Sequence, residues 1–490
     1  MSIHVHKFGG SCLSAVEDID AIVERIRESE GQKIVVVSAF RGITDRIIEQ
    51  IDFESATPNS AFTASLELEH LDRVPEIATS PWCIRFADTL HHLSNCLDSY
   101  LELPDIDVRA DALACGERLS SLAIAAALDA RGVPVIPAWS EDIGIRLIGR
   151  GEDARVDAAR TKESLQLPAG SVPVITGWYG VTKTGYALLG RGGSDLTATA
   201  VAAAVDASSV TIWRDVEGVL ALSPRWTLPA RNLSNLSYTE AAELALFSQP
   251  MLHPSAVEPL REQGIPMNLR PLHSPEDDGT IIGPSIRLET PSVRAVGCLP
   301  RQIQFSWSLS SAMSLTECVT NAMSALARSR IRVTSVRAQP GHVRILISSR
   351  MAARARRILS AQPSLPTPEI GASVSILCFV GEGIGEATDV LLIDESICIG
   401  CDNCEKACAE THNGISRLDR EAGPTFANVH VPTSCRHCEH PHCMTDCPPD
   451  AIKRNLEGEV YITNDCIGCG NCERNCPYGV IQMAPEPPKK

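Results

Sequence analysis

The sequence comprises 490 residues, which is too long for a single hydrophobic core and predicts about three domains. Its hydrophobic content of 44% and charged content of 21% are ordinary for a globular protein. The net charge of −16 argues against nucleic acid as a partner, and no apolar run is long enough to span a membrane. The first residues lack the basic and apolar segments of a signal peptide, so we expect a cytoplasmic protein.

The first part of the chain alternates predicted strands and helices. Strands are expected at 2–8, 33–37, 133–136, 172–175, 185–189 and 209–213, and helices at 13–28, within 61–103, from Cys115 onward, at 196–205 and at 238–246. Several strands end in a glycine-bearing turn that enters a helix. In α/β proteins of this pattern, ligands collect at the carboxyl ends of the strands.

The segment LLGRGGSD, from Leu188 to Asp195, is the most informative of these turns. Its three glycines let backbone N–H groups approach an anion, with the N-terminus of a helix behind them. Arg191 offers a planar fork suited to a carboxylate or phosphate. Asp195 could hold a metal or orient a lysine. Taken alone, the same pattern also fits a simple turn.

Other motifs follow one another in a fixed order. They are KFGG from Lys7, VVSAFRGITD ending at Asp45, GERLSS from Gly116, TGWYG from Thr176, LLGRGGSD, DVEGV from Asp215, SPR from Ser223, LSYTEAAEL from Leu236, MLHPSAVEP from Met251 and DDGTII from Asp277. Together they resemble the aspartate kinases of the amino-acid kinase family. The resemblance implies an α/β fold, the amino-acid kinase three-layer sandwich, over residues 1–285.

The resemblance also implies a chemistry, which is transfer of the γ-phosphoryl group of ATP to the β-carboxylate of L-aspartate or a similar amino acid, with Mg²⁺. Such a transfer depends on positioning and positive charge. Lys7 would neutralise the phosphoryl group, Glu117 would bind the substrate ammonium, and Arg191 its α-carboxylate. The remaining implied residues are Ser38, Thr44 and Ser194 on the substrate side, Asp195 at the magnesium end, and Gly9, Gly10, Asp215 and Arg225 on the nucleotide side.

The nucleotide side departs from the family pattern. Arg214 stands where a threonine is usual, Leu220 replaces an aromatic residue, and Ser223 replaces an aspartate. Pro250 replaces the lysine that supplies a second positive charge to the ATP phosphates. Removing one such donor typically lowers the rate by about 10²–10³. We therefore expect either an adapted kinase, in which Arg214 restores the charge, or a domain that binds amino acid without fast transfer.

Residues 290–388 form a second predicted domain. Strands are expected at 301–309, 331–337 and 342–347, and helices at 314–329 and 351–360. This order resembles the small α+β ACT module, which binds an end-product amino acid at the interface of a homodimer in aspartate kinases. A strand at 374–380 resembles the opening of a second, truncated module. A purely structural or dimerising module remains the alternative.

Cysteine is the unusual feature of the composition, because 12 of the 19 cysteines lie between Cys398 and Cys476. Dense CxxC spacing in a cytosolic chain predicts metal binding rather than disulfides. The other seven are expected to be small buried hydrophobic residues: Cys12, Cys83, Cys96, Cys115, Cys298, Cys318 and Cys378. His91 and His92 are expected at the surface.

Two of the three cysteine groups have the spacing of bacterial ferredoxins, and the domain at 389–484 is predicted to hold two or three 4Fe-4S clusters. The groups are Cys398, Cys401, Cys404 and Cys408; Cys435, Cys438, Cys443 and Cys447; and Cys466, Cys469, Cys472 and Cys476. The middle group resembles the electron-transfer subunits of molybdopterin oxidoreductases. That resemblance implies two four-cysteine ligand sets: Cys435, Cys438, Cys443 and Cys476, and Cys466, Cys469, Cys472 and Cys447.

The first group then serves a third cluster or a labile site. Zinc is the alternative metal, because His437, His440 and His442 lie among the cysteines of the middle group. The whole chain is interpreted as an aspartate kinase with an electron-transfer or redox-sensing domain and an unidentified redox partner. The rival interpretation is an electron-transfer protein whose kinase domain serves as an amino-acid sensor or dimer platform.

Overall fold

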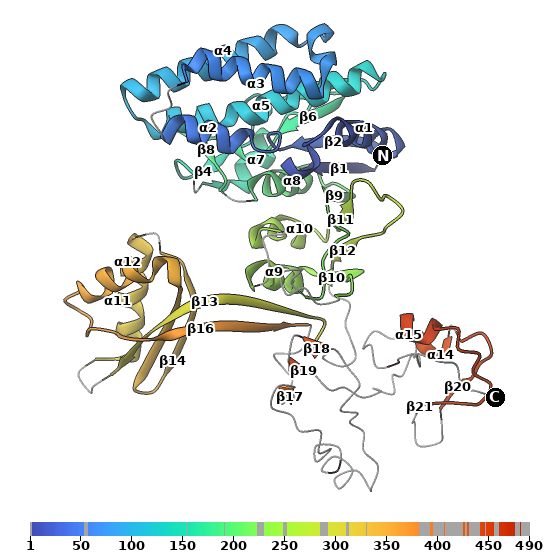
Figure 1. The fold of residues 1–490 in the computed structure, drawn as a ribbon, viewed down its shortest axis with the longest axis vertical. Helices are drawn as coiled ribbons and strands as arrows, with labels where there is room; N and C mark the ends of the chain where they lie inside the picture. The colour runs from blue at the N-terminus through green and yellow to red at the C-terminus, as the bar shows by residue number, and fades with distance from the viewer. Residues whose placement is uncertain are drawn as a thin grey trace. The chain divides into compact units, whose positions relative to one another are not determined.

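The computed structural model describes residues 2–52, 57–152, 154–190, 192–222, 230–247, 252–284, 293–309, 313–329 and 331–381, and then 393–394, 406, 425–426, 429–430, 442–445, 447–454, 460–475 and 481. The chain divides into two compact units (Figure 1). Unit 1 comprises Met1–Ala295 and Val380–Lys490, and unit 2 comprises Val296–Phe379.

Unit 1 is built on an eight-stranded sheet with the strand order β10-β12-β11-β9-β1-β2-β6-β3. Its strands are β1 (Ile3–Phe8), β2 (Gln32–Val37), β3 (Val135–Ala138), β6 (Val172–Thr176), β9 (Ser209–Arg214), β10 (Asn235–Ser237), β11 (Met267–Pro271) and β12 (Thr280–Gly283). All neighbours run parallel except β11 and β12. The carboxyl ends of β9, β1, β2 and β6 therefore lie side by side at one edge of the sheet.

Helices cover both faces of this sheet (Figure 1). They include α1 (Val16–Glu28), α2 (Ile43–Asp52), α3 (Asn59–Arg73), α4 (Cys83–Glu102), α5 (Ile106–Ala130), α7 (Ala158–Ser164), α8 (Gly193–Ala204), α9 (Tyr238–Phe247) and α10 (Glu258–Arg261). Val35 and Val37 belong to the large apolar core that contains most of α5. Ile34 and Val36 are equally buried but lie outside that core, because successive strand side chains point to opposite faces.

The opposite face is covered by α8. Lys7 pairs in register with Val36 and therefore shares its face, and the Lys7 ammonium contacts Asp195 of α8. The arrangement is thus helix, sheet and helix, as the sequence predicted.

Helix α5 begins earlier than the sequence predicted. The expected start was Cys115, whereas the helix begins at Ile106, where the Asp105 side chain accepts hydrogen bonds from two backbone N–H groups of the first turn. From Ala110 to Leu128 the helix is buried almost without interruption, and its many alanines let it pack closely on the sheet. Glu117 consequently lies in the middle of a buried helix rather than at its start.

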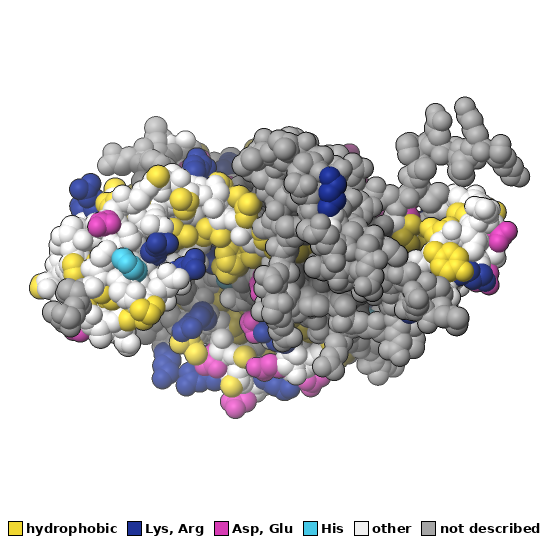
Figure 2. Space-filling view, turned by 90° about the horizontal axis from the view of Figure 1, so that it is seen from below, with side chains coloured by type: hydrophobic (Ala, Val, Ile, Leu, Met, Phe, Trp, Pro, Cys, Tyr) yellow, Lys and Arg dark blue, Asp and Glu magenta, His cyan; other side chains and the backbone are white. Residues whose placement is uncertain are grey.

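Unit 2 is a four-stranded sheet with two helices. The elements are β13 (Ala295–Ser308), α11 (Leu315–Arg328), β14 (Val333–Gln339), β15 (His342–Ser348), α12 (Ser349–Ser360) and β16 (Glu369–Val380), with the strand order β14-β15-β13-β16. The strand expected at 374–380 is the end of β16, so it completes this sheet instead of opening a second module. Part of the surface of unit 2 is visible on the left of Figure 2, where apolar and basic side chains are intermingled.

The described part of the cysteine-rich region contains short elements. They are β17 (Ile393–Asp394), β18 (Thr425–Phe426), β19 (Val429–His430), α14 (His442–Thr445), β20 (Ile452–Arg454), β21 (Val460–Ile462) and α15 (Asn471–Asn475). Among all the residues described, no helix is both long enough and apolar enough to cross a membrane.

Candidate functional site

A buried charge cluster lies where β1, β9 and the first turn of α8 meet. The Lys7 ammonium is 2.6 Å from Asp195 Oδ1, and Arg214 Nη2 donates to Asp195 Oδ2 at 2.7 Å. The side chains of Lys7 and Asp195 are about 5% exposed, and that of Arg214 is 19% exposed. Two cations thus share one carboxylate, which leaves one excess positive charge at the carboxyl edge of the sheet.

The pKa shifts in this cluster follow from burial and mutual charge. Burial alone would raise the pKa of the Asp195 carboxyl, but Arg214 and Lys7 outweigh it and hold the pKa below its ordinary value. Burial and the nearby Arg214 lower the pKa of Lys7, and the Asp195 carboxylate opposes this change. The carboxylate therefore keeps two like charges together in a site from which water is largely excluded.

The cluster retains capacity for an anionic ligand. Arg214 Nε is buried and has no hydrogen-bond partner among the described residues. Buried donors are normally satisfied, so an unpaired donor at this edge of the sheet is available to bind an anion. Gly9 lies beside the same cluster, because a Cβ atom on residue 9 would be 2.9 Å from the Lys7 ammonium. A side chain at residue 9 would therefore push the Lys7 ammonium away from its present position.

The glycine-rich turn before α8 is held by Trp178, a residue to which sequence reasoning gave no role. The Trp178 indole N–H donates to the Gly190 carbonyl at 2.8 Å, and its own backbone adopts a left-handed φ of 69°. Gly192, with φ of 72°, immediately precedes the helix, and a Cβ atom on Gly193 would lie 2.5 Å from the Trp178 ring. The TGWYG motif contains Trp178, but only the fold shows that it supports the turn.

Helix α8 begins at Gly193, three residues earlier than expected, so Ser194 and Asp195 occupy its first turn. Ser194 is buried against the turn that follows β6, where a Cβ atom on Gly177 would lie 2.7 Å from Ser194 Oγ. The first turn of α8 is therefore locked between the ends of β1, β6 and β9.

Glu117 lies one strand further along the same edge. Its Oε1 accepts a hydrogen bond from the Ala39 backbone N–H at 3.2 Å, in the turn that follows β2. Its Oε2 is buried and has no hydrogen-bond partner among the described residues. Burial raises the pKa of the Glu117 carboxyl to about 8, with the Ala39 hydrogen bond acting in the opposite direction. An unsatisfied buried carboxyl oxygen is a fitting receptor for an ammonium group.

The two sites are adjacent because their turns pack together. A Cβ atom on Gly10 would lie 3.2 Å from the Ala39 carbonyl oxygen, so the turn after β1 lies against the turn after β2. Ser38, half-buried at the end of β2, donates its backbone N–H to the Phe8 carbonyl at 3.1 Å. Thr44 is half-buried in the first turn of α2.

The predicted nucleotide-side residues are only partly described. Asp215 is exposed directly after β9, and Leu220 forms an isolated β-bridge with Asn232. Arg191, Ser223, Arg225 and Pro250 lie outside the described residues.

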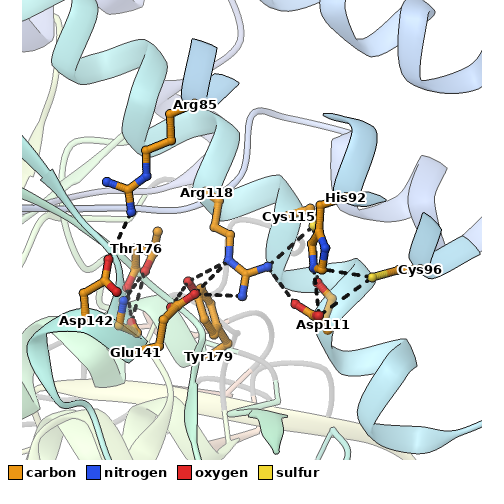
Figure 3. A network of polar contacts seen from close by, with 11 residues as sticks. Arg85, His92, Cys96, Asp111, Cys115, Arg118, Glu141, Asp142, Thr176 and Tyr179 are labelled. Atoms are coloured by element: carbon orange, nitrogen blue, oxygen red, sulfur yellow. Dashed lines mark hydrogen bonds and ion pairs between the residues drawn. The ribbon is translucent and has the colours of Figure 1, made fainter. Parts of the chain in front are cut away.

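A second polar network, also missed from the sequence, surrounds Arg118 (Figure 3). Arg118 is 3% exposed and bridges Asp111 of α5, at 2.7 Å, and Glu141, at 2.8 Å. Its Nε also donates to the Tyr179 hydroxyl at 3.2 Å. Burial alone would lower the pKa of Arg118, but its acidic neighbours outweigh this and raise it. Because Arg118 follows Glu117 on α5, the network fixes the orientation of the helix that carries Glu117.

The cysteine-rich region contains a cavity whose lining fits an iron–sulfur cluster. Its cysteines are Cys447, Cys466, Cys469 and Cys472, the implied ligand set of one cluster. The Ala451 backbone N–H donates to Cys447 Sγ at 3.3 Å. Gly468 and Gly470 both have left-handed φ, which lets the loop curl so that three cysteines face one cavity.

Of the other implied cluster ligands, Cys443 lies in α14. The remainder fall outside the described residues: Cys398, Cys401, Cys404, Cys408, Cys435, Cys438 and Cys476. The same is true of His437 and His440.

Comparison with known proteins identifies both parts of the chain. Residues 2–270 match the model of the amino acid kinase family, and residues 426–487 match a 4Fe-4S dicluster domain. The dicluster match favours iron–sulfur over zinc in that region.

The chain is similar to aspartokinases. It is 32% identical over 298 residues to aspartokinase 1, chloroplastic, of Arabidopsis thaliana, covering 57% of this chain and 51% of that protein. It is 28% identical to an aspartokinase of Geobacillus stearothermophilus, covering 59% of this chain and 61% of the relative. The chain thus spans about three-fifths or less of the length of these curated relatives.

Solved structures share the fold. E. coli aspartokinase III in complex with aspartate and ADP (R-state) has a TM-score of 0.69 at 20% identity, covering 88% of this chain and 95% of that chain. Aspartate kinase of Clostridium acetobutylicum has a TM-score of 0.63 at 19% identity, with the same coverage. The predicted fold class is confirmed. The chain belongs to the amino acid kinase family and carries a 4Fe-4S dicluster domain in its C-terminal part.

Proposed function

We propose that this protein is an aspartate kinase-type phosphotransferase that converts ATP and L-aspartate to ADP and 4-phospho-L-aspartate. The observation that carries the proposal is the pair of unsatisfied buried groups at one sheet edge: the Arg214 Nε donor and the Glu117 Oε2 acceptor. The Arg214 donor can bind an anion, and the Glu117 carboxylate can bind a cation. ATP phosphates and an amino-acid ammonium meet these requirements together.

On the nucleotide side, Lys7 and Arg214 bring two positive charges toward the transferring phosphoryl group. Phosphoryl transfer is catalysed mainly by such positioning and charge, with no covalent intermediate on the protein. Arg214 therefore takes the electrostatic role of the family lysine that Pro250 replaces. Both Asp195 oxygens already contact cations. We assign Asp195 to orienting Lys7 and Arg214. Mg²⁺ bound together with ATP would neutralise part of the charge of its phosphates.

On the substrate side, Glu117 receives the ammonium group of aspartate, and Arg191 takes its α-carboxylate. Ser38, Thr44 and Ser194 contribute polar contacts from the turns of β2, α2 and α8. One acid and one fork-shaped base fix a substrate with one ammonium and two carboxylates in a single orientation. Gly9, Gly10, Asp215 and Arg225 complete the nucleotide side.

We further propose that the domains span 1–285, 290–388 and 389–484. The middle module would dimerise the chain. In the last domain, Cys447, Cys466, Cys469 and Cys472 would hold one 4Fe-4S cluster and Cys435, Cys438, Cys443 and Cys476 a second. The group from Cys398 to Cys408 would supply a third. Such clusters supply one-electron transfer, so this domain either passes electrons to a redox partner or reports redox state to the kinase.

The test uses the product and a substrate analogue. The full chain, prepared anaerobically with clusters loaded, is supplied with ATP, Mg²⁺ and L-aspartate, and the acyl phosphate is trapped with hydroxylamine as the aspartyl hydroxamate. Succinate, which lacks the ammonium, serves as the matched control. The proposal predicts hydroxamate from aspartate and little from succinate. If aspartate binds without giving ADP or hydroxamate, the rival function of an electron-transfer protein with an amino-acid-sensing domain takes its place.

A further inference from the structure

A second cluster of ligand-type side chains, none of them a predicted kinase residue, lies between helices α4 and α5. His92 and Cys96 are four residues apart on α4, so they project from the same face of that helix. Asp111 faces them from α5. The three ligand atoms, His92 Nε2, Cys96 Sγ and an Asp111 carboxylate oxygen, all lie within 4.8 Å of one another (Figure 3).

Two of the three separations between these atoms match the edges of a tetrahedral metal site. Zinc binds sulfur at about 2.3 Å and nitrogen or oxygen at about 2.0–2.2 Å, so tetrahedral angles require S···N and S···O edges of about 3.5 Å and an N···O edge of about 3.3 Å. Cys96 Sγ lies 3.5 Å from His92 Nε2 and 3.7 Å from Asp111 Oδ2, while His92 Nε2 lies 2.8 Å from Asp111 Oδ2. Opening this last hydrogen bond by about 0.5 Å would admit the ion.

Burial of the cluster decreases from the thiol through the carboxylate to the imidazole. Cys96 is 7% exposed, the Asp111 side chain is 16% exposed, and the His92 side chain is 48% exposed. The Cys96 sulfur and the Asp111 carboxylate are thus mostly buried between the helices, and the His92 imidazole lies at the protein surface. Water can reach the fourth position from the same side.

The second oxygen of the carboxylate is already fixed. Arg118 Nη1 donates to Asp111 Oδ1 at 2.7 Å, which leaves Oδ2 for His92 and Cys96. Metal-ligating carboxylates are commonly oriented by such an outer hydrogen bond. Glu141 lies against the other side of Arg118 and offsets part of its positive charge. The network in Figure 3 therefore preorganises the Asp111 ligand.

We propose that His92, Cys96 and Asp111 form a binding site for Zn²⁺ or a similar late transition-metal ion, with water as the fourth ligand. A thiol and an imidazole favour such ions over Mg²⁺ and Ca²⁺, which prefer all-oxygen ligands. Binding releases the thiol proton of Cys96 to solvent. The proton on Nε2 of neutral His92 moves to Nδ1, so Nε2 and Asp111 Oδ2 each replace their mutual hydrogen bond by a bond to the metal. The ion clamps α4 to α5, which is also the helix that carries Glu117.

The experiment is zinc K-edge X-ray absorption on the full chain with its clusters assembled anaerobically, after one equivalent of Zn²⁺ is added. The proposed site gives about one sulfur at 2.3 Å and about three nitrogen or oxygen neighbours near 2.0 Å, whereas zinc in a cluster site would give four sulfurs. His92→Ala is compared with His91→Ala, since His91 is the adjacent exposed histidine of the same helix. Cys96→Ser is compared with Cys83→Ser on α4.

The proposal predicts a mixed sulfur and nitrogen or oxygen shell and a loss of about one zinc per chain in His92→Ala and Cys96→Ser, but not in the two control variants. Added Zn²⁺ should also raise the Tm of the parent and of His91→Ala without changing that of His92→Ala. Equal zinc content in His92→Ala and His91→Ala would overturn the proposal. A shell of sulfur alone, or no zinc retained by the parent, would do the same and leave a hydrogen-bonded triad.

Discussion

Arg214 Nη2 lies 2.7 Å from Asp195 Oδ2, on the carboxylate whose other oxygen contacts Lys7. A residue that departs from the family pattern is therefore part of the buried charge cluster. Its position explains how a chain with Pro250 in place of a lysine can still gather two positive charges at this edge of the sheet.

The first prediction concerns this replacement charge. Arg214→Ala should lower kcat by about 10²-fold, because one electrostatic donor at the transferring phosphoryl group is lost. The KM for aspartate should change little, since the substrate side is untouched. Arg214→Lys keeps a positive charge and should recover part of the rate. Steady-state kinetics on the three proteins tests this, and parental activity in Arg214→Ala would remove Arg214 from the mechanism.

Glu117 predicts a pH dependence of substrate binding. Its carboxyl has a pKa raised to about 8 by burial, so it is largely neutral below that pH in the ligand-free site. Pairing with the substrate ammonium requires the carboxylate, so the apparent affinity for aspartate should rise as the pH increases from about 6.5 to about 8.5. In Glu117→Gln the affinity should fall roughly 10–100-fold, the loss of a charge-assisted hydrogen bond of about 1.5–3 kcal/mol, and this pH dependence should vanish. Calorimetric titration of both proteins across this range measures it.

The same shift predicts how stability depends on pH. The folded pKa of Glu117, about 8, lies above the ordinary glutamate value of 4.5, so the folded state binds more protons between these limits. The contribution of Glu117 to the free energy of unfolding is fully present below pH about 4.5 and is lost as the pH rises through about 8. Urea unfolding of the parent should show this decline more steeply than Glu117→Gln. Identical slopes in the two proteins would show that the Glu117 carboxyl titrates normally.

We expect the Trp178 side chain to stabilise the glycine-rich turn that precedes α8. Trp178→Phe removes the indole N–H that donates to the Gly190 carbonyl. The variant should lose about 1 kcal/mol of stability, the usual net value of one hydrogen bond. Its KM for aspartate should rise because the turn carrying Arg191 is less firmly held. Trp82→Phe, outside this turn, is the control. A Trp178→Phe protein with parental KM and stability would contradict the role.

The cluster ligands predict an iron content. Three filled sites hold about twelve irons per chain and two hold about eight, at four irons for each cluster. Cys466→Ser should lose about four irons relative to the parent, because Cys466 lines the described cavity. Cys83→Ser should lose none. Iron analysis of anaerobically prepared protein decides between these counts, and an unchanged count in Cys466→Ser would exclude it as a ligand.

Features that depend on short segments of the chain could be predicted from the sequence. The strand ends, the glycine-rich turn and the cysteine spacing are local patterns, and they placed Lys7 near the end of a strand and Asp195 at the start of a helix, as the structure has them. The start of α5 was missed because its first turn, capped by Asp105, alternates apolar and charged residues and lacks the apolar spacing of a helix. The last strand was assigned to a second module because the pairing of β16 with β13 joins segments far apart in the chain.

Roles that depend on tertiary contacts could not be predicted. Trp178 and Arg118 stood in recognised motifs, yet their partners Gly190 and Glu141 come from other elements. The approach of Asp111 to His92 and Cys96 likewise requires that α4 and α5 be packed together. Residue types alone showed only an exposed histidine and a buried cysteine.

The most direct test of the account is ADP formation by the anaerobically prepared, cluster-loaded chain, measured with and without L-aspartate and with the clusters first oxidised and then reduced. An aspartate kinase should show aspartate-dependent turnover in at least one redox state, and a difference between the states would make the iron–sulfur domain a regulator of the kinase. Absence of turnover in both states, with aspartate still bound, would contradict the account and leave electron transfer as the chemistry of this protein.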